Sequence, residues 1–230
     1  MLAVGLAEDV AAARIRDLDG VEIAAVNSPT GVTLAGDSAP LAQLEQELAA
    51  EGVFARALRV EVPYHSHLMD PILSELRSEL AVLNPAGPTL PLYSTVTGAR
   101  VDADSDGWGP RYWADNVRRS VRFADAVGAL IEDGHRVFLE VGPHPVLSGN
   151  IREVLLRRGE TGAVFSTLNR TRDDVESVRT TLAELYSVGA LSTANPPDGL
   201  LGPVRQQPLP THEFQRVDLW VVDERVDREL

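Results

Sequence analysis

The first 62 residues constrain the fold most, because strand and helix patterns follow one another there in the order β-α-β-β-α-β. Residues 1–6 are apolar and alternate weakly, and an amphipathic helix pattern follows them. Two β-branched runs, 21–27 and 31–35, flank a Ser-Pro-Thr-Gly turn and should pair as a hairpin. A helix opening at Ser38 and a strand over 55–62 complete the order. The N-terminal part therefore predicts a split βαβ unit of the ferredoxin-like kind.

The remainder of the chain reads as an α/β layer followed by a linker. The spacing of Leu68, Ile72, Leu76, Leu80 and Leu83 predicts one amphipathic helix after the first unit. Later patterns predict short strands at 92–96 and 99–101, an irregular stretch after them, helices at 121–131, 146–156 and 173–188, and strands at 136–141 and 164–168. The strand at 136–141 is continuously apolar, so we expect it to be buried on both faces. From residue 191 onward, proline and glycine interrupt every periodicity, which indicates an extended linker.

Composition excludes several classes of function. The formal net charge is −13, which argues against nucleic acid as a partner because phosphate binding needs clustered Lys and Arg. The chain contains no Cys, so neither a disulfide nor a thiolate zinc site can form. The N-terminus carries acidic residues too early for a signal peptide, and no apolar run reaches membrane-spanning length. We expect a cytoplasmic protein that binds neither nucleic acid nor a membrane.

Two histidines one residue apart are the main candidates for chemistry. His65 and His67 stand in the segment VPYHSHLMDPI, between the strand at 55–62 and the following helix. A metal site would need further ligands, and only Asp70 is near in the sequence. Half-buried packing at a strand end is the ordinary role for such residues, whereas a histidine held between a proline and a helix can also act as a general base. Spacing does not choose among metal binding, packing and catalysis.

Three other motifs have two readings each. Arg118, Arg119 and Arg122 could bind a phosphate or carboxylate, or could form a solvated helix face. The aspartates of 102–106 lack the glycine and glutamate of a calcium-binding EF-hand loop, so we interpret the segment as an exposed loop. Gly-Pro-His-Pro at 142–145 follows the buried strand and could be a binding turn or simply a rigid one.

Several segments, taken together and in order, resemble one family. MLAVGLAED, AAVNSPTGVTLAGD, VPYHSHLMDPI, RYWADNVRRSVRFADAV and FLEVGPHPVLSGNI resemble the C-terminal part of the acyltransferase domain of type I polyketide synthases, which is related to malonyl-CoA:acyl-carrier-protein transacylases. LPTHEFQRVDLW resembles the linker that follows that domain. The resemblance covers essentially the whole chain.

The resemblance implies an α/β (α+β) fold in three parts. It implies a ferredoxin-like small subdomain at 1–62, the C-terminal part of an α/β-hydrolase-like large subdomain at 63–190, and a post-acyltransferase linker at 191–230. It also implies ping-pong transfer of an acyl group from acyl-CoA to the phosphopantetheine thiol of an acyl carrier protein, with no bound cofactor and no metal. A serine in a GHSxG elbow is the nucleophile in that chemistry, and a histidine is the base.

Alignment with the family segment places the base at His65, with His67 as its neighbour. Val62 and Tyr64 are expected to contact substrate, and Asn27, on a strand of the small subdomain, either faces the cleft and contacts substrate or caps a turn. The resemblance implies that Tyr112 and Asn116 belong to a segment that supports the catalytic histidine through a backbone carbonyl. Malonyl-selective members carry HAFH where this chain has Val-Pro-Tyr-His, and methylmalonyl-selective members carry YASH. Since an aromatic at Tyr64 would crowd an α-methyl branch, we expect selection of malonyl.

No G-x-S-x-G sequence occurs in the 230 residues, so the nucleophile implied by the resemblance is missing. We expect a fragment that is inactive alone, because a base without its nucleophile and oxyanion donors loses most of its effect. Its partners would be an acyl carrier protein and a neighbouring ketosynthase or upstream acyltransferase half. The alternative interpretation is a docking or scaffold piece without catalysis.

Overall fold

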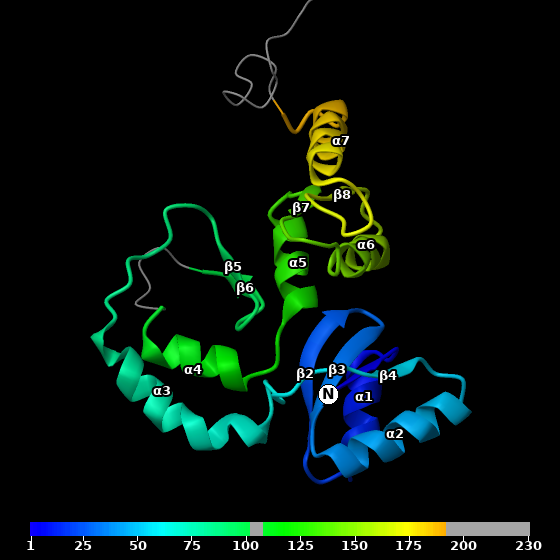
Figure 1. Ribbon diagram of the computed structural model, residues 1–230, viewed down its shortest axis with the longest axis vertical. Coiled ribbons are helices and arrows are strands. Elements are labelled where there is room, and N and C mark those ends of the chain that lie inside the picture. The colour runs from blue at the N-terminus through cyan, green and yellow to red at the C-terminus, as the bar shows by residue number, and fades with distance from the viewer. Residues whose placement is uncertain (102–107, 192–230) are drawn as a thin grey trace, which may run out of the picture. The chain divides into compact units, whose positions relative to one another are not determined.

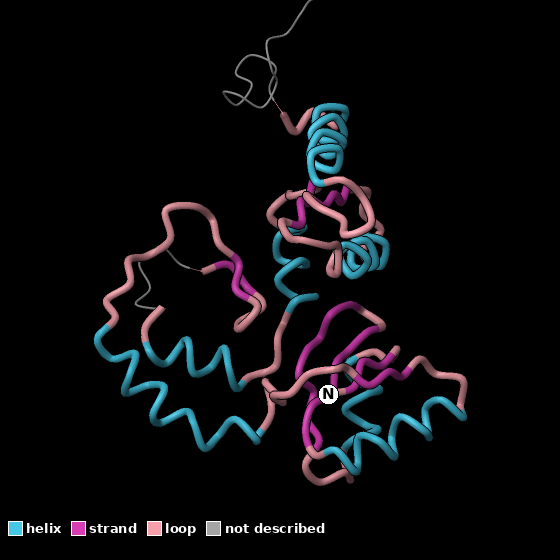
Figure 2. Tube along the Cα trace, viewed as in Figure 1, coloured by secondary structure: helices cyan, strands magenta, loops and turns pink. Residues whose placement is uncertain are grey.

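The computed structural model describes residues 1–101 and 108–191, and Figures 1 and 2 show its helices and strands along the chain. The strands are β1 (Leu2–Val4), β2 (Val21–Ser28), β3 (Gly31–Gly36), β4 (Ala55–Ala57), β5 (Tyr93–Ser94), β6 (Ala99–Arg100), β7 (Val137–Glu140) and β8 (Ala163–Ser166). The α-helices are α1 (Glu8–Ile15), α2 (Ser38–Ala50), α3 (Leu73–Glu79), α4 (Pro110–Arg118), α5 (Phe123–Glu132), α6 (Ser148–Arg157) and α7 (Asp174–Ser187). Two 3₁₀ helices, η1 (His67–Ile72) and η2 (Leu80–Val82), flank α3. The aspartate loop at 102–106 and the expected linker beyond residue 191 lie outside the described residues.

The N-terminal strands form one antiparallel sheet in the order β2-β3-β1-β4. The central strand β1 pairs on one side with β3 and on the other with β4, so that Leu2 faces both Leu34 and Ala57. With α1 and α2 as the two connections, this is the strand order of a ferredoxin-like unit. The prediction for the N-terminal part is confirmed.

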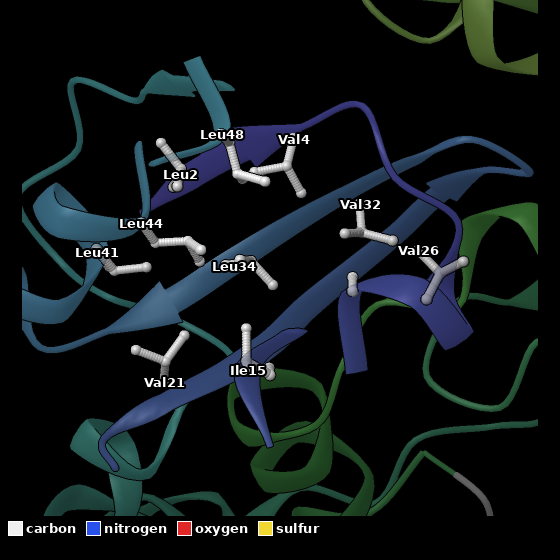
Figure 3. Close-up of a cluster of buried hydrophobic side chains, with 11 residues drawn as sticks. Leu2, Val4, Ile15, Val21, Val26, Val32, Leu34, Leu41, Leu44 and Leu48 are labelled. Carbon is white, nitrogen blue, oxygen red and sulfur yellow. The ribbon is translucent and has the colours of Figure 1, made fainter. Parts of the chain in front are cut away.

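Both helices of this unit lay their apolar residues on one face of the sheet, as Figure 3 shows. In α2, the leucines at helical spacing are buried, as the sequence predicts. The buried members of this cluster are Leu2, Val4, Ala11, Ile15, Val21, Val26, Val32, Leu34, Leu41, Leu44 and Leu48. The small unit therefore has a core of its own.

The strand predicted over 55–62 is much shorter than expected, because β4 ends at Ala57. β4 pairs only with β1, and β1 begins at Leu2. One further hydrogen bond joins the N–H of Leu58 to the carbonyl of Met1, and residues 59–64 form no further ladder with β1. The chain turns instead, and the segment that leads to His65 is free of the sheet.

The helix predicted from Leu68 to Leu83 begins as the 3₁₀ helix η1, continues as α3 and ends as η2. No residue of α3 is fully buried, and its leucines, Leu73 and Leu76, are half-buried. The irregular stretch expected before residue 121 is wrong for residues 110–118, which form α4. Pro110 occupies the first turn of this helix, where its missing N–H costs nothing. Only Ala114 is buried there, and the helix is largely polar.

The second layer contains the parallel pair β7 and β8. Helices α5 and α6 pack on it around a second apolar cluster. The expectation that the β7 segment is buried on both faces is wrong. Phe138 is buried, whereas Val137 and Leu139 are 40% and 41% exposed. Helices α5 and α6 cover the face of the pair that carries Phe138, and α7 contacts β8. Among residues 1–101 and 108–191, no helix is long and apolar enough to cross a bilayer.

Candidate active site

The backbone at His65 adopts a left-handed conformation, with φ at 63°. No other non-glycine residue in the described part of the chain has a positive φ. Such a conformation costs about 1–3 kcal/mol and persists only where its surroundings enforce it. Here the hydroxyl of the fully buried Ser66 donates to the carbonyl of Pro63 at 2.7 Å and closes the loop around His65. The strained residue is thus the same histidine that the family alignment selects.

The end of α4 holds His65 at two points. Its backbone N–H donates to the carbonyl of Val117 at 2.9 Å, and its ring Nδ1 lies 2.8 Å from the carbonyl oxygen of Arg119. A carbonyl oxygen only accepts, so Nδ1 carries the proton. The neutral ring is therefore held with Nε2 unprotonated, and Nε2 is the atom able to take up a proton.

The surroundings of His65 also keep its ring neutral near physiological pH. Burial lowers the pKa of His65 below its ordinary value of 6.5, and the hydrogen bond to Arg119 opposes this in part by favouring the charged form. A general base must be unprotonated at the start of the reaction. The shift is in the direction that such a role requires.

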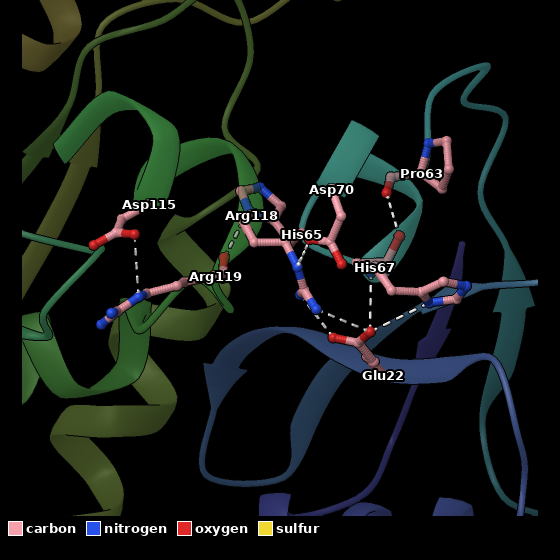
Figure 4. A network of polar contacts seen from close by, with 9 residues as sticks. Glu22, Pro63, His65, His67, Asp70, Asp115, Arg118 and Arg119 are labelled. Atoms are coloured by element: carbon pink, nitrogen blue, oxygen red, sulfur yellow. Dashed lines mark hydrogen bonds and ion pairs between the residues drawn. The ribbon is translucent and has the colours of Figure 1, made fainter. Parts of the chain in front are cut away.

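His67 lies in a different environment, which Figure 4 compares with that of His65. Its backbone N–H donates to Oε1 of Glu22 at 2.9 Å, and its Nδ1 lies 3.2 Å from the same oxygen. Both contacts fasten the start of η1 to strand β2. Among the described residues, no three His, Asp, Glu or Cys side chains gather as a metal site.

The three arginines near the site are each paired with carboxylates. Arg118 contacts Glu22 and Asp70, Arg119 contacts Asp115, and Arg122 contacts Glu8 and Asp125. A surface of this kind carries little free positive charge. The guanidinium of Arg118 binds two carboxylates of the chain itself and so bridges β2 and η1.

The expected substrate residues fall into two groups. Tyr64 is half exposed, and its ring centroid lies 6.3 Å from that of His65, so it flanks the histidine directly. Val62 is exposed on the same segment. Asn27 instead lies in β2, where its amide donates to the hydroxyl of Thr33 at 3.0 Å. That bond joins β2 to β3 and gives the side chain a structural partner.

The two residues expected to support the histidine lie on α4 but make other contacts. The hydroxyls of Tyr112 and Ser94 are 2.8 Å apart, and the Tyr112 ring contacts Trp108 at a tilt and Trp113 edge to face. Asn116 lines an apolar groove between α3 and α4 with Leu76 and other residues. The groups that touch His65 are the carbonyls of Val117 and Arg119, one to three residues further along.

Sequence reasoning missed Glu22 and left the supporting carbonyl unidentified. A charged residue inside the β-branched run 21–27 was the available signal for Glu22, since such a strand interior is otherwise apolar. No sequence signal identifies a backbone carbonyl, because every residue carries one.

Comparison with known proteins agrees with this architecture. The acyl transferase domain family model matches residues 1–191. The chain is 39% identical over 176 residues to a mycocerosic acid synthase-like polyketide synthase of Mycolicibacterium smegmatis, covering 76% of this chain and 8% of that protein. It is 37% identical over 224 residues to polyketide synthase GfsA of Streptomyces halstedii, covering 96% of this chain and 3% of that protein. The chain thus spans a small part of these curated relatives.

Solved structures give the same result. The acyltransferase domain from module 8 of the salinomycin polyketide synthase superimposes with a TM-score of 0.78 at 32% identity, covering 82% of this chain and 44% of that one. A malonyl CoA-acyl carrier protein transacylase from Clostridium perfringens shares the fold, with a TM-score of 0.69 at 22% identity. The chain belongs to the acyl transferase domain family of type I polyketide synthases.

Proposed function

We propose that this chain supplies the general base for transfer of an acyl group from acyl-CoA to the phosphopantetheine thiol of an acyl carrier protein. The observation that carries the proposal is the hydrogen bond from Nδ1–H of His65 to the carbonyl of Arg119, which leaves Nε2 as the proton acceptor. The family resemblance assigns the base to the same residue. The lowered pKa of His65 keeps Nε2 free near neutral pH.

The proposed reaction has two half-reactions. A serine hydroxyl attacks the acyl-CoA thioester while its proton passes to Nε2 of His65, and the tetrahedral intermediate then expels CoA, whose sulfur takes that proton. In the second half, the thiol of phosphopantetheine gives its proton to Nε2 and attacks the acyl-serine ester. The proton returns to the serine oxygen as the acyl thioester leaves. The carbonyl of Arg119 stabilises the imidazolium in both halves.

The serine must come from a sequence outside these 230 residues, which contain no G-x-S-x-G. The chain spans 44% of the solved salinomycin domain, which leaves room for the remainder of the fold. Support also comes from exposed apolar side chains on the two 3₁₀ helices that flank α3 and on β7, among them Ile72, Val82 and Leu139. We propose that these pack against the serine-bearing part of a complete domain, with the carrier protein as its second substrate.

Malonyl-CoA is the proposed substrate. Tyr64 flanks His65 and is 47% exposed, so it can limit the space beside the reacting acyl group. One methyl group is worth about 1–3 kcal/mol in such a pocket. In the reconstituted enzyme described next, Tyr64→Ser should therefore move the malonyl-to-methylmalonyl ratio of kcat/KM by about 10- to 200-fold toward methylmalonyl. An unchanged ratio would remove Tyr64 from the selection of substrate.

The experiment that tests the function is reconstitution with the N-terminal half of a type I polyketide synthase acyltransferase domain that carries the GHSxG serine. The two chains are co-expressed, and transfer of radiolabelled malonyl from CoA to a carrier protein is measured. Loss of a general base lowers such rates by about 10²- to 10⁴-fold, so His65→Ala should fall in that range. His67→Ala is the matched control, one residue away, and should retain most of the rate.

Two results would contradict the proposal. The first is transfer that continues at the normal rate in His65→Ala. The second is stable acylation of the isolated chain by labelled malonyl-CoA, because it would mean that a nucleophile is present within these residues. A soluble complex that transfers nothing would favour the docking interpretation instead.

A further inference from the structure

Glu22 links strand β2 to the loop that carries His65. Its Oε1 accepts the backbone N–H of His67 at 2.9 Å and lies 3.2 Å from Nδ1 of the same residue. His65 and His67 are separated only by the fully buried Ser66, whose hydroxyl is itself bonded within the loop. Glu22 therefore fastens the chain immediately after the strained residue.

Glu22 is equally tied to the helix end that holds the His65 ring. Its carboxylate accepts from both terminal nitrogens of Arg118, at 2.8 and 3.2 Å, in a two-pronged contact. Nε of Arg118 donates to Asp70 in η1 at 2.6 Å. A bidentate contact of this kind fixes the orientation of the guanidinium relative to the carboxylate as well as their distance.

Arg118 lies in the sequence between the two residues that hold His65, so its contact with Glu22 also fixes their backbone. The residues on either side of it, Val117 and Arg119, supply the two carbonyls that hold His65. Beyond them, Val121 exchanges hydrogen bonds with β2: its N–H donates to Ala24 and its carbonyl accepts from Val26, both at 2.8 Å. Strand β2 thus fixes the end of α4 from two directions and the histidine loop from a third, as Figure 4 shows for the side chains.

We propose that Glu22 is a positioning residue for His65: through the backbone N–H of His67 and the guanidinium of Arg118 it holds the histidine loop and the α4 carbonyls in register, and so fixes the Nδ1–H tautomer of the ring. The proposal rests on the proposed function, since positioning matters for catalysis only if His65 acts as the base. A left-handed histidine is costly, and the Glu22 bridge supplies the constraint that keeps it. Both partners are largely covered, with side chains 35% and 28% exposed.

The test reads the His65 ring directly, in the whole 230-residue chain. Histidine ring ¹⁵N and ¹³C spectra are recorded against pH for the normal chain, Glu22→Gln and Glu22→Ala, and His65→Ala identifies the His65 signals. In the normal chain we expect one neutral tautomer, protonated at Nδ1, and a midpoint below 6.5. In both Glu22 variants we expect a mixture of tautomers and a midpoint that moves up toward 6.5 as the loop loosens.

Glu160→Gln is the matched control. Glu160 pairs with Arg136 at 3.0 Å with similar exposure, at 39% and 35%, but it lies near β8 and makes no contact with the histidine loop. Its loss should leave the His65 spectrum unchanged. Glu22→Gln keeps the shape of the side chain, so it decides the question even if Glu22→Ala does not fold. An unchanged tautomer and midpoint in folded Glu22→Gln would overturn the proposal.

Activity separates this inference from the proposed function. In the reconstituted enzyme, Glu22→Gln should lower kcat by about tenfold with little change in KM, and Glu22→Asp should restore part of the loss because it keeps the charge. If His65→Ala retains full transfer, the proposed function fails whatever the spectra show. If His65→Ala loses transfer but Glu22→Gln changes neither ring nor rate, only the positioning role fails.

Discussion

The two sheets of this chain differ in how much of their apolar surface is covered. In the sheet β2-β3-β1-β4, Leu34 is fully buried, and Leu44 of α2 packs within the same cluster. In the pair β7-β8, one face packs on α5 and α6 while Val137 and Leu139 remain about 40% exposed. The buried members of the first cluster all lie within residues 2–48, whereas the second pair keeps exposed apolar side chains on β7. The N-terminal unit should hence be the more stable of the two.

His65 lies between these two regions in the sequence, and residues on both sides of it hold it in place. Its loop leaves β4 and is fastened to β2, whereas its ring is held by the end of α4, which leads into α5. A stable sheet that fixes a strained histidine suits catalysis, because a base must be held close to the reacting geometry. The less completely covered layer is the part we expect to depend on further contacts.

The largest expected difference between the two sheets is in how far a Leu→Ala substitution lowers the free energy of unfolding. Leu34→Ala should lower the free energy of unfolding by about 2–5 kcal/mol, because it leaves a cavity in a closed core. The same change at Leu139, which is 41% exposed, should cost about 0.5 kcal/mol or less. Urea unfolding followed by circular dichroism measures both. Equal losses at the two positions would mean that the exposed face of β7 is covered in solution.

A smaller loss of stability is expected from a substitution of Glu140, at the turn between β7 and α6. Glu140 accepts hydrogen bonds from the backbone N–H groups of Val146, Leu147 and Ser148 and from the Ser148 hydroxyl. Burial alone would raise its pKa, but these bonds outweigh burial and lower it below 4.5. Glu140→Gln should cost about 1 kcal/mol, as for loss of a helix cap.

The pH dependence of stability checks this explanation of the Glu140 contacts. A carboxyl whose pKa is lower in the folded chain stabilises it above pH 4.5, and this contribution disappears as pH falls through the folded value. The normal chain should therefore lose its advantage over Glu140→Gln on acidification below 4.5. A constant difference between the two down to pH 3 would contradict the proposed role of the charge.

The smallest expected effect is at His65. Its pKa is lowered in the folded chain, so the unfolded chain binds the proton more readily, and stability should decrease as pH falls from 6.5 toward the folded value. Above 6.5 the two states are both neutral, and His65 makes no pH-dependent contribution. The difference in Tm between the normal chain and His65→Gln, followed from pH 7.5 to 5, measures this effect. A difference that grows in favour of the normal chain on acidification would contradict it.

The sequence predicted the N-terminal unit well because its signals are local. Alternating strands, a proline-containing turn and a leucine stripe each identify one element, and the order of elements then limits the topology. It failed where the outcome depends on a partner. The end of β4 depends on its pairing with β1 at the other end of the unit, and α4 buries only Ala114 among its residues. The exposure of Leu139 depends on what covers β7.

In the candidate site, too, local features could be predicted from the sequence and contacts with distant residues could not. The family resemblance selected His65, but the groups that orient it are two backbone carbonyls and a glutamate distant in the sequence. Carbonyls have no side-chain signature, and Glu22 is separated from His67 by 45 residues. Only the folded chain brings them together.

The most direct test of the account is the pH dependence of kcat/KM for malonyl transfer by the reconstituted domain, compared with the titration of His65 in the same complex. A general base must lose its proton before it acts, so the rate should fall on the acid side with the midpoint measured for the His65 ring, below 6.5. Any residual activity in His65→Gln should lack that acid limb. An acid limb that differs from the His65 titration, or that persists in His65→Gln, would show that another group is the base.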